Sequence, residues 1–133
     1  AYNSLYTIPW HLTTVETVQS IYDILNDDGI AMINIISRIS GPGSEFLRAE
    51  LATFREVFPN VYAFALHDGS DESRLQSIIL VAMKNHEKKA VFNSDHPSYG
   101  EFLDDEVSDR IITDMPILTD QHAPVEFYTN KAL

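Results

Sequence analysis

The sequence predicts an α/β fold in which helices flank a three-stranded mixed sheet. Apolar runs at residues 30–36 and 61–66 indicate buried strands, and the amphipathic segment between them indicates a helix. A third apolar run, at residues 77–83, follows a short polar connection. A helical crossover joins parallel strands, whereas a short loop joins antiparallel ones. We therefore expect the first two strands to form a parallel pair and the third to run antiparallel.

The chain opens with a loop-like segment, residues 1–12, which leads directly into a helix. Thr13 and Glu16 have the spacing of a capping box, in which each side chain bonds to the other residue's backbone N–H. Gly29 follows the helix and suits a left-handed cap. The apolar face of the helix consists of Val15, Val18, Tyr22 and Leu25. Because no strand precedes the loop, we interpret the chain as the back part of a larger domain.

The remaining elements follow in order. The run at 30–36 is almost entirely apolar, which is typical of a strand covered on both faces. Ser44 is a candidate N-cap for the next helix, whose apolar stripe continues to Phe58. Residues 85–100 look irregular, residues 101–109 suggest a short helix, and residues 117–127 suggest an extended tail.

Composition narrows the classes of function. Twenty acidic and nine basic residues give a net charge of −11, which disfavours binding to nucleic acid and tolerates a cationic ligand. The absence of cysteine excludes disulfides and thiolate chemistry. No apolar run approaches the ~20 residues of a membrane span, so we expect no membrane contact by this segment and a cytoplasmic location.

Four short motifs resemble the spermidine synthase-like family, and they look closest to its broader bacterial members, which are often fused to membrane segments. They are Ile8 to Leu12, Leu25 to Gly29, Phe58 to Val61, and Leu118 to Glu126. The resemblance implies the C-terminal half of a Rossmann-like methyltransferase fold, with the third strand inserted between the first two. It divides the chain into an active-site-type loop (1–12), an αβαββ core (13–84) and an irregular C-terminal extension (85–133).

The resemblance also implies where the site residues lie. The aspartate that helps to deprotonate the amine in this family would precede Ala1, so no catalytic residue is expected within the chain. Tyr2, Asn3, Trp10 and His11 would then contact the substrate. The stretch from His67 to Ser73 lacks the proline and tyrosine that line the amine pocket of polyamine synthases, so the parent need not make spermidine.

The family transfers an aminopropyl or methyl group from S-adenosylmethionine or its decarboxylated form. The Gly-rich turn and the acid that hold this donor do not lie within the chain. We therefore expect that the fragment binds no cofactor and is inactive alone. The parent's acceptor would be a small cationic or nucleoside substrate.

Other candidate sites have simpler explanations. The turn from Gly41 to Ser44 lacks the lysine of a phosphate-binding loop and is better explained as a connector. Asp104 to Glu106 is better explained as a solvated face than as a metal site. Asp120 and Glu126 flank His122 in an acid–base arrangement, but a tail that satisfies polar groups is the better explanation. None of the five histidines has metal-ligand spacing, so no metal is expected.

If the chain is half of a doubly wound sheet, its first strand loses its neighbour on one side and becomes an exposed edge. Exposed edges pair with other chains, so we expect a homo-oligomer in which the strands from Ile30 meet across a two-fold axis. The rival hypothesis is a catalytically dead, dimerising interaction module. A third possibility is a small-molecule-binding domain that uses the pocket for another nucleoside. Separately, Trp10, Tyr2 and Tyr6 either stack on an adenine or cover a pocket, or they only bury the leading loop.

Overall fold

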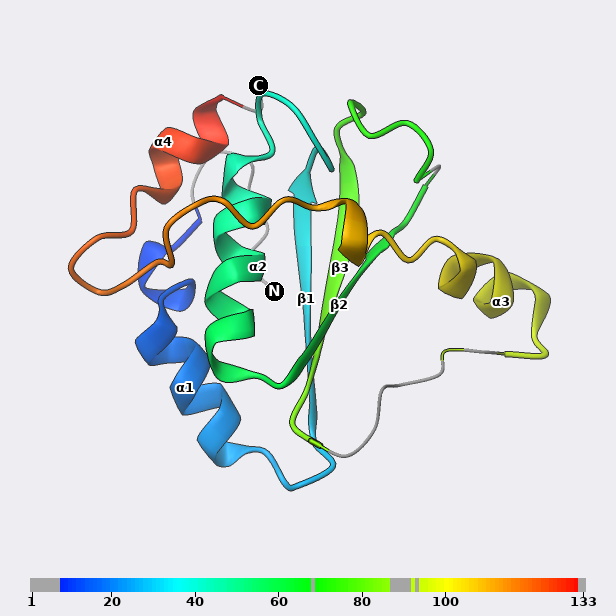
Figure 1. Cartoon of the computed structure of the whole chain (residues 1–133), viewed down its shortest axis with the longest axis horizontal. Helices are drawn as coiled ribbons and strands as arrows, with labels where there is room; N and C mark the ends of the chain where they lie inside the picture. The colour runs from blue at the N-terminus through cyan, green and yellow to red at the C-terminus, as the bar shows by residue number, and fades with distance from the viewer. Residues whose placement is uncertain (1–7, 68, 87–91, 93, 132–133) are drawn as a thin grey trace.

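The chain forms a three-stranded sheet with helices on both faces (Figure 1). The computed structural model describes residues 8–67, 69–86, 92 and 94–131. The strands are β1 (Ile30–Ser37), β2 (Asn60–Ala65) and β3 (Gln76–Met83), in the order β1–β3–β2. All three strands therefore lie within two residues of the apolar runs that predicted them.

The strand order is as expected, but the predicted mixed sheet is wrong. Every hydrogen-bonded strand pair is antiparallel: β3 pairs with β1 along its whole length and with all of β2. β1 and β2 run in the same direction, yet β3 lies between them and they never pair. The crossover helix therefore fixed the relative direction of the two strands without making them neighbours.

Three helices cover one face of the sheet: α1 (Val15–Ile24), α2 (Glu45–Val57) and α4 (Val125–Asn130) (Figure 1). The main core lies between these helices and the sheet, and its largest fully buried members are Phe54, Ile39, Leu47, Leu51, Ile78 and Leu80. On the opposite face, α3 (Pro97–Asp104) packs over β2, where the rings of Phe64 and Phe102 lie 5.3 Å apart. Two short 3-10 helices, η1 (Trp10–Leu12) and η2 (Ser108–Arg110), complete the elements within the described residues.

The start of α1 differs from the predicted capping box by one residue. Thr14 is the N-cap and accepts a bond from the N–H of Thr17 at 3.5 Å. The Thr13 hydroxyl instead donates to the carbonyl of Trp10 at 2.7 Å, because η1 has brought that carbonyl within reach. The carboxylate of Glu16 accepts from the backbone N–H of Asp120 at 3.0 Å. The two side chains of the predicted capping box therefore bond elsewhere, Thr13 to the preceding turn and Glu16 to the C-terminal tail.

Gly29 and Ser44, which were predicted to cap helix ends, have other roles in the structure. Gly29 does not adopt a left-handed conformation, since the described glycines with positive φ are Gly41 and Gly43. A Cβ at Gly29 would lie 2.7 Å from the Cβ of Leu25, so glycine is needed there for close approach. Ser44 stands at the N-cap position of α2 but makes no capping bond, because its hydroxyl donates to the Gly41 carbonyl at 2.6 Å.

The C-terminal part is more regular than expected. α3 begins at Pro97, four residues earlier than the predicted helix, and α4 replaces part of the predicted extended tail. The segment before α4 runs back over the first two helices, where the carbonyl of Leu118 accepts from the N–H of Val15 at 2.8 Å. Within the described ranges, no helix has the length and apolar character needed to cross a membrane.

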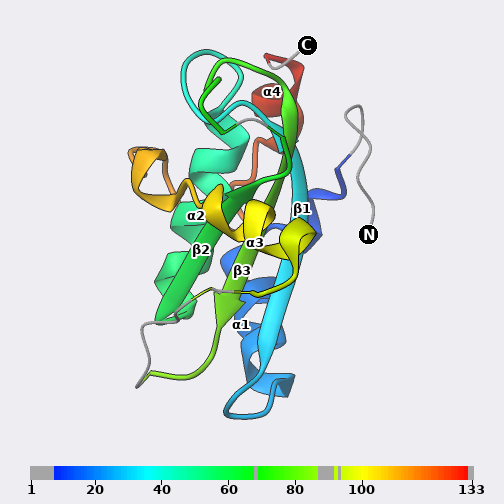
Figure 2. The same cartoon turned by 90° about the vertical axis from the view of Figure 1, so that its right-hand side faces the viewer.

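β1 is open on one face, contrary to the expectation of a strand covered on both faces. Ile30 is 49% exposed and Met32 is 65% exposed, and Asn34 is exposed as well. The alternate residue Ile35 is buried against the helices. Figure 2 shows β1 at one edge of the sheet, on the opposite side of β3 from β2. The first half of β1 therefore presents apolar side chains to solvent.

Candidate functional site

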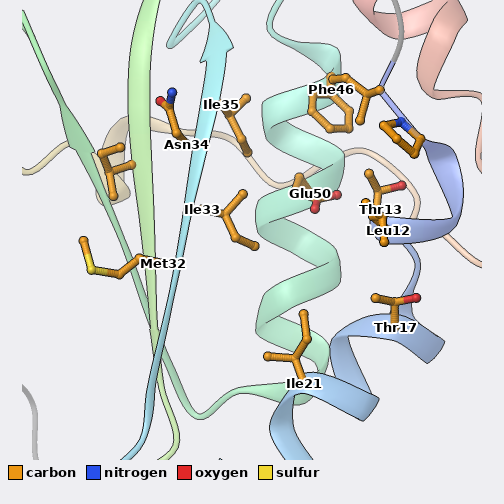
Figure 3. A pocket seen from close by; sticks show the side chains of 13 residues that line it. Leu12, Thr13, Thr17, Ile21, Met32, Ile33, Asn34, Ile35, Phe46 and Glu50 are labelled. Carbon is orange, nitrogen blue, oxygen red and sulfur yellow. The ribbon is translucent and has the colours of Figure 1, made fainter. Parts of the chain in front are cut away.

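A pocket of about 610 Å³ lies between the outer side of β1, α2 and the η1–α1 corner (Figure 3). Its volume falls within the range of roughly 300–1,000 Å³ that is usual for small-ligand sites. Most of its wall is apolar, from Leu12, Ile21, Ile33 and Phe46. The polar groups in this wall therefore decide what the pocket can hold.

Among the described residues that line this pocket, Glu50 is the one with an ionisable side chain. It lies on α2 and is 2% exposed, and its Oε2 has no hydrogen-bond partner among the described residues. Burial raises the pKa of Glu50 well above its usual range. An acid held in this way can donate a hydrogen bond while protonated, or it can pair with a cation that enters the pocket.

The position of Glu50 follows from the helical period of α2. It comes three residues after Leu47 and four before Phe54, and both of these are fully buried. The sequence analysis missed it because only apolar residues were traced along that face. An acid at the spacing of an apolar stripe is the signal that would have found it.

The threonine hydroxyls near the pocket are engaged by the backbone of η1. Thr13 donates to the carbonyl of Trp10 at 2.7 Å, and Thr17 donates to the carbonyl of His11 at 2.6 Å. These bonds fix the 3-10 turn against the start of α1. In Figure 3 the carboxyl of Glu50 points toward Thr13 and away from β1, the strand that carries Asn34.

The structure places two of the four predicted substrate residues beside the pocket. Trp10 and His11 are exposed on η1, with their rings edge-to-face at 5.9 Å. Their neighbours Pro9 and Leu12 line the pocket, whereas Trp10 and His11 do not. Tyr2 and Asn3 lie outside the described residues, as does Tyr6.

The turn after β1 shows no arrangement for an anion. The backbone N–H of Gly43 donates to the Glu45 carboxylate at 2.7 Å, and the Ser44 hydroxyl donates to the Gly41 carbonyl. Donors of the kind that bind phosphate elsewhere are therefore used within the turn. This agrees with its interpretation as a connector.

Two acidic residues of the C-terminal part, Asp120 and Glu106, have structural partners. Asp120 accepts from the Thr14 hydroxyl at 2.7 Å and so ties the tail to the start of α1. Glu106 accepts from the backbone N–H of Ser108 at 3.2 Å. In the part of the chain that the structure describes, no three His, Asp or Glu side chains gather at a site that would hold a metal ion.

Comparison with known proteins gives a likeness of fold and no match to a family or a curated protein. No family model and no curated protein matches the chain. The chain is similar to the crystal structure of a probable spermidine synthase from Corynebacterium glutamicum ATCC 13032, with 24% sequence identity and a TM-score of 0.51. The match covers 68% of this chain and 30% of that one, so the chain spans less than a third of that protein's length. Over the matched part, the chain has a spermidine synthase-like fold.

Proposed function

We propose that this chain forms the C-terminal part of a spermidine synthase-like transferase, which moves an aminopropyl or methyl group from an S-adenosyl donor. The observation that carries the proposal is the strand order β1–β3–β2, in a fold similar to that of a probable spermidine synthase. The four motifs quoted above give independent support. We place the protein in the cytoplasm, in polyamine biosynthesis or a related pathway.

In this proposal the chain supplies acceptor contacts and the rest of the parent supplies donor binding. Tyr2, Asn3, Trp10 and His11 contact a small cationic or nucleoside acceptor. The net charge of −11 favours a cation. S-adenosylmethionine or its decarboxylated form is held elsewhere, so the 133 residues alone neither bind the donor nor catalyse transfer.

The first experiment reads the gene upstream of the codon for Ala1. The proposal expects a codon for aspartate immediately before it, and further upstream a glycine-rich strand–turn–helix. A start codon next to Ala1 would contradict the transferase proposal. Isothermal titration of the 133-residue chain with both donors is the second experiment, and saturable binding would contradict the expected inactivity.

Variants of the longer protein test the acceptor contacts. Trp10→Ala and His11→Ala are expected to raise KM for the acceptor while donor affinity stays unchanged. Gln19→Ala is a matched control, because Gln19 is exposed on α1 and bonds to Asp23 at 2.8 Å. Equal effects on KM from all three variants would mean that Trp10 and His11 do not contact the acceptor.

A second candidate function is a catalytically inactive interaction module. The observation that favours it is the outer edge of β1, where Ile30 and Met32 are exposed on a strand that pairs, among the described residues, with β3 alone. Such edges template pairing with another chain. If the partner is a second copy, light scattering will give a dimer mass at high concentration, and Met32→Lys will shift the population toward monomer.

A further inference from the structure

A second pocket, which the transferase proposal does not use, lies between the C-terminal end of β2 and α3. Its volume is about 790 Å³, and all of its lining residues lie within 65–67 and 98–105. In Figure 1, α3 and α1 lie on opposite sides of the sheet. β3 separates β2 from β1, so this pocket is distinct from the one that Glu50 lines.

α3 presents a largely polar face to this pocket. The residues at positions 98, 101, 102 and 105 have the spacing of one helix face, and all four line the pocket. The apolar one is Phe102, whose ring lies 5.3 Å from that of Phe64 on β2. A helix usually turns apolar positions toward a sheet. Glu101 and Asp105 therefore stand where packing alone would favour apolar side chains.

The two carboxylates on this face lack a cation. Glu101 and Asp105 lie four residues apart, a spacing at which like charges on a helix repel each other. Asp105 is also the C-cap of α3, where the helix dipole favours positive charge, and the last turn contains no basic residue. Among the described residues, neither carboxylate forms a hydrogen bond or an ion pair. A bound cation would relieve both unfavourable terms.

A backbone carbonyl of β2 offers a third acceptor. The N–H of Ala65 donates to the carbonyl of Asp105 at 3.0 Å, on the outer side of β2. The N–H and C=O of one residue point to the same side of an antiparallel strand, so the Ala65 carbonyl points to that side as well. The N–H of Asp105 does not bond to it, because it donates to the carbonyl of Phe102 at 3.2 Å. Ala65 lines the pocket, so its carbonyl can accept from a ligand there.

The aromatic part of the wall selects the kind of cation. The side chain of Tyr99 is 63% exposed, and it lines the pocket together with Phe102. A guanidinium is flat, stacks on aromatic rings and carries five N–H donors in a rigid fork, so one group can bond to two carboxylates and a carbonyl. An ammonium is compact and more strongly hydrated, so it gains less from the rings. Leu66 is exposed in the same wall and offers apolar contact to a stem.

We propose that the pocket between β2 and α3 binds a guanidinium group carried on an apolar stem, with Glu101 and Asp105 as its anionic partners. The guanidinium lies against the rings of Tyr99 and Phe102, and the stem lies along Leu66. A free alkylguanidine and an arginine side chain of another protein carry this same group, and the test separates these two sources.

The test titrates the chain with three probes that share one stem: butylguanidine, butylamine and butylurea. Butylurea has the flat shape without the charge, and butylamine has the charge without the flat shape. Binding is followed by ¹H–¹⁵N NMR at pH 8, because a neutral imidazole at His67 can accept a hydrogen bond whereas a protonated one would repel the guanidinium. We expect butylguanidine to bind about tenfold more tightly than butylurea and about threefold more tightly than butylamine, with shifts at residues 65–67 and 98–105.

Three variants assign the contacts. Glu101→Gln and Asp105→Asn are each expected to weaken butylguanidine binding about threefold and to leave butylurea binding unchanged. Tyr99→Leu should bring the affinity for butylguanidine close to that for butylamine, because the flat face is lost. Asp104→Asn is the matched control, since Asp104 is exposed on the same helix, does not line the pocket and changes the net charge equally.

Three results would overturn the proposal. Equal affinity for butylguanidine and butylurea would mean that the carboxylates do not hold the ligand. Equal affinity for butylguanidine and butylamine in the unchanged chain would make this a general cation site. Equal weakening by Asp104→Asn would mean that the net negative charge attracts the probe, and not this pocket.

Acetyl-Gly-Arg-Gly-amide separates the two sources of the group. Tighter binding than that of butylguanidine would support an arginine side chain of a partner protein, and weaker binding would support a free alkylguanidine. The pocket uses neither an S-adenosyl donor nor Trp10 and His11, so this proposal and the transferase proposal can fail separately.

Discussion

The hydroxyl of Thr53, in the middle of α2, accepts a hydrogen bond from the backbone N–H of Leu118 at 2.9 Å. The same hydroxyl donates to the carbonyl of Ala49 at 2.7 Å, so both of its roles are used in a fully buried position. The carbonyl of Leu118 in turn accepts from the N–H of Val15. One residue of the tail therefore joins the two helices that form one wall of the pocket.

Thr53→Val is expected to lower the free energy of unfolding by about 1–3 kcal/mol, because it leaves the buried N–H of Leu118 without a partner. Urea denaturation followed by circular dichroism measures the change. Thr53→Ser keeps the hydroxyl and is expected to lose less than Thr53→Val. Equal losses from the two variants would mean that packing, and not the hydrogen bond, holds the tail.

Lys84 closes the end of α1. Its ammonium donates to the carbonyls of Tyr22 and Leu25, both at 2.8 Å, and lies 4.5 Å from the centre of the Tyr22 ring. Lys84→Met is expected to lower the free energy of unfolding by about 1–2 kcal/mol, because the last carbonyls of the helix lose their cation.

Lys131 provides the control for this change. It also lies over an aromatic ring, 4.6 Å from the centre of Phe127, but its side chain is 46% exposed and its ammonium pairs with the carboxylate of Glu45 at 3.5 Å and not with helix carbonyls. Lys131→Met should therefore change thermal stability very little. A similar fall in both variants would show that loss of positive charge from an acidic protein, and not the helix end, causes the effect.

Gly29 and Gly41 are needed for different reasons, and two substitutions distinguish them. A Cβ at Gly29 would lie 2.8 Å from the carbonyl of Asn26, whereas Gly41 has φ +75° and nothing within 4 Å of an added Cβ. Alanine should cost about 1–3 kcal/mol at Gly29 through overlap and about 1–2 kcal/mol at Gly41 through backbone strain.

Asparagine separates the two causes, because it tolerates the left-handed region. Gly41→Asn should recover much of the stability lost in Gly41→Ala, whereas Gly29→Asn should recover none. Thermal unfolding of the four variants makes the comparison. Recovery at both positions would mean that Gly29, too, is under conformational strain.

The sequence predicted the elements of the sheet well and its pairing incompletely. Apolar runs located all three strands because burial on a sheet leaves a local signature. The antiparallel pairing of β3 with both neighbours is non-local, and periodicity carries no information about which strand lies between two others. The resemblance to a known family supplied the correct order, which the crossover argument alone did not.

Helix ends and the site show a similar limit. Thr13 and Glu16 satisfied a local capping rule, yet Trp10 and Asp120 took their bonds once η1 and the tail had folded against α1. Glu50 was visible as an acid at core spacing, but its lack of a partner depends on packing around it. The sequence shows which side chains could cap a helix end. It does not show which of several possible partners each side chain bonds to once the chain has folded.

The last prediction concerns Glu50 and pH. Burial raises its pKa, so the folded protein holds a proton that the unfolded chain releases. Below the unfolded pKa the carboxyl is protonated in both states and carries no penalty. As pH rises from there toward the folded pKa, unfolding gains the free energy of ionisation, about 1.4 kcal/mol per pH unit. Stability from this group is therefore present in acid and lost as pH rises through the folded pKa.

Glu50→Gln removes that titration. We expect the variant to match the natural chain in free energy of unfolding near pH 4 and to exceed it by about 1–3 kcal/mol at pH 7, measured by urea denaturation at each pH. Glu56→Gln, an exposed change on the same helix, should show no such divergence. A difference that stays constant with pH would mean that the pKa of Glu50 is the same in the folded and the unfolded chain, which would contradict the rise in pKa through burial.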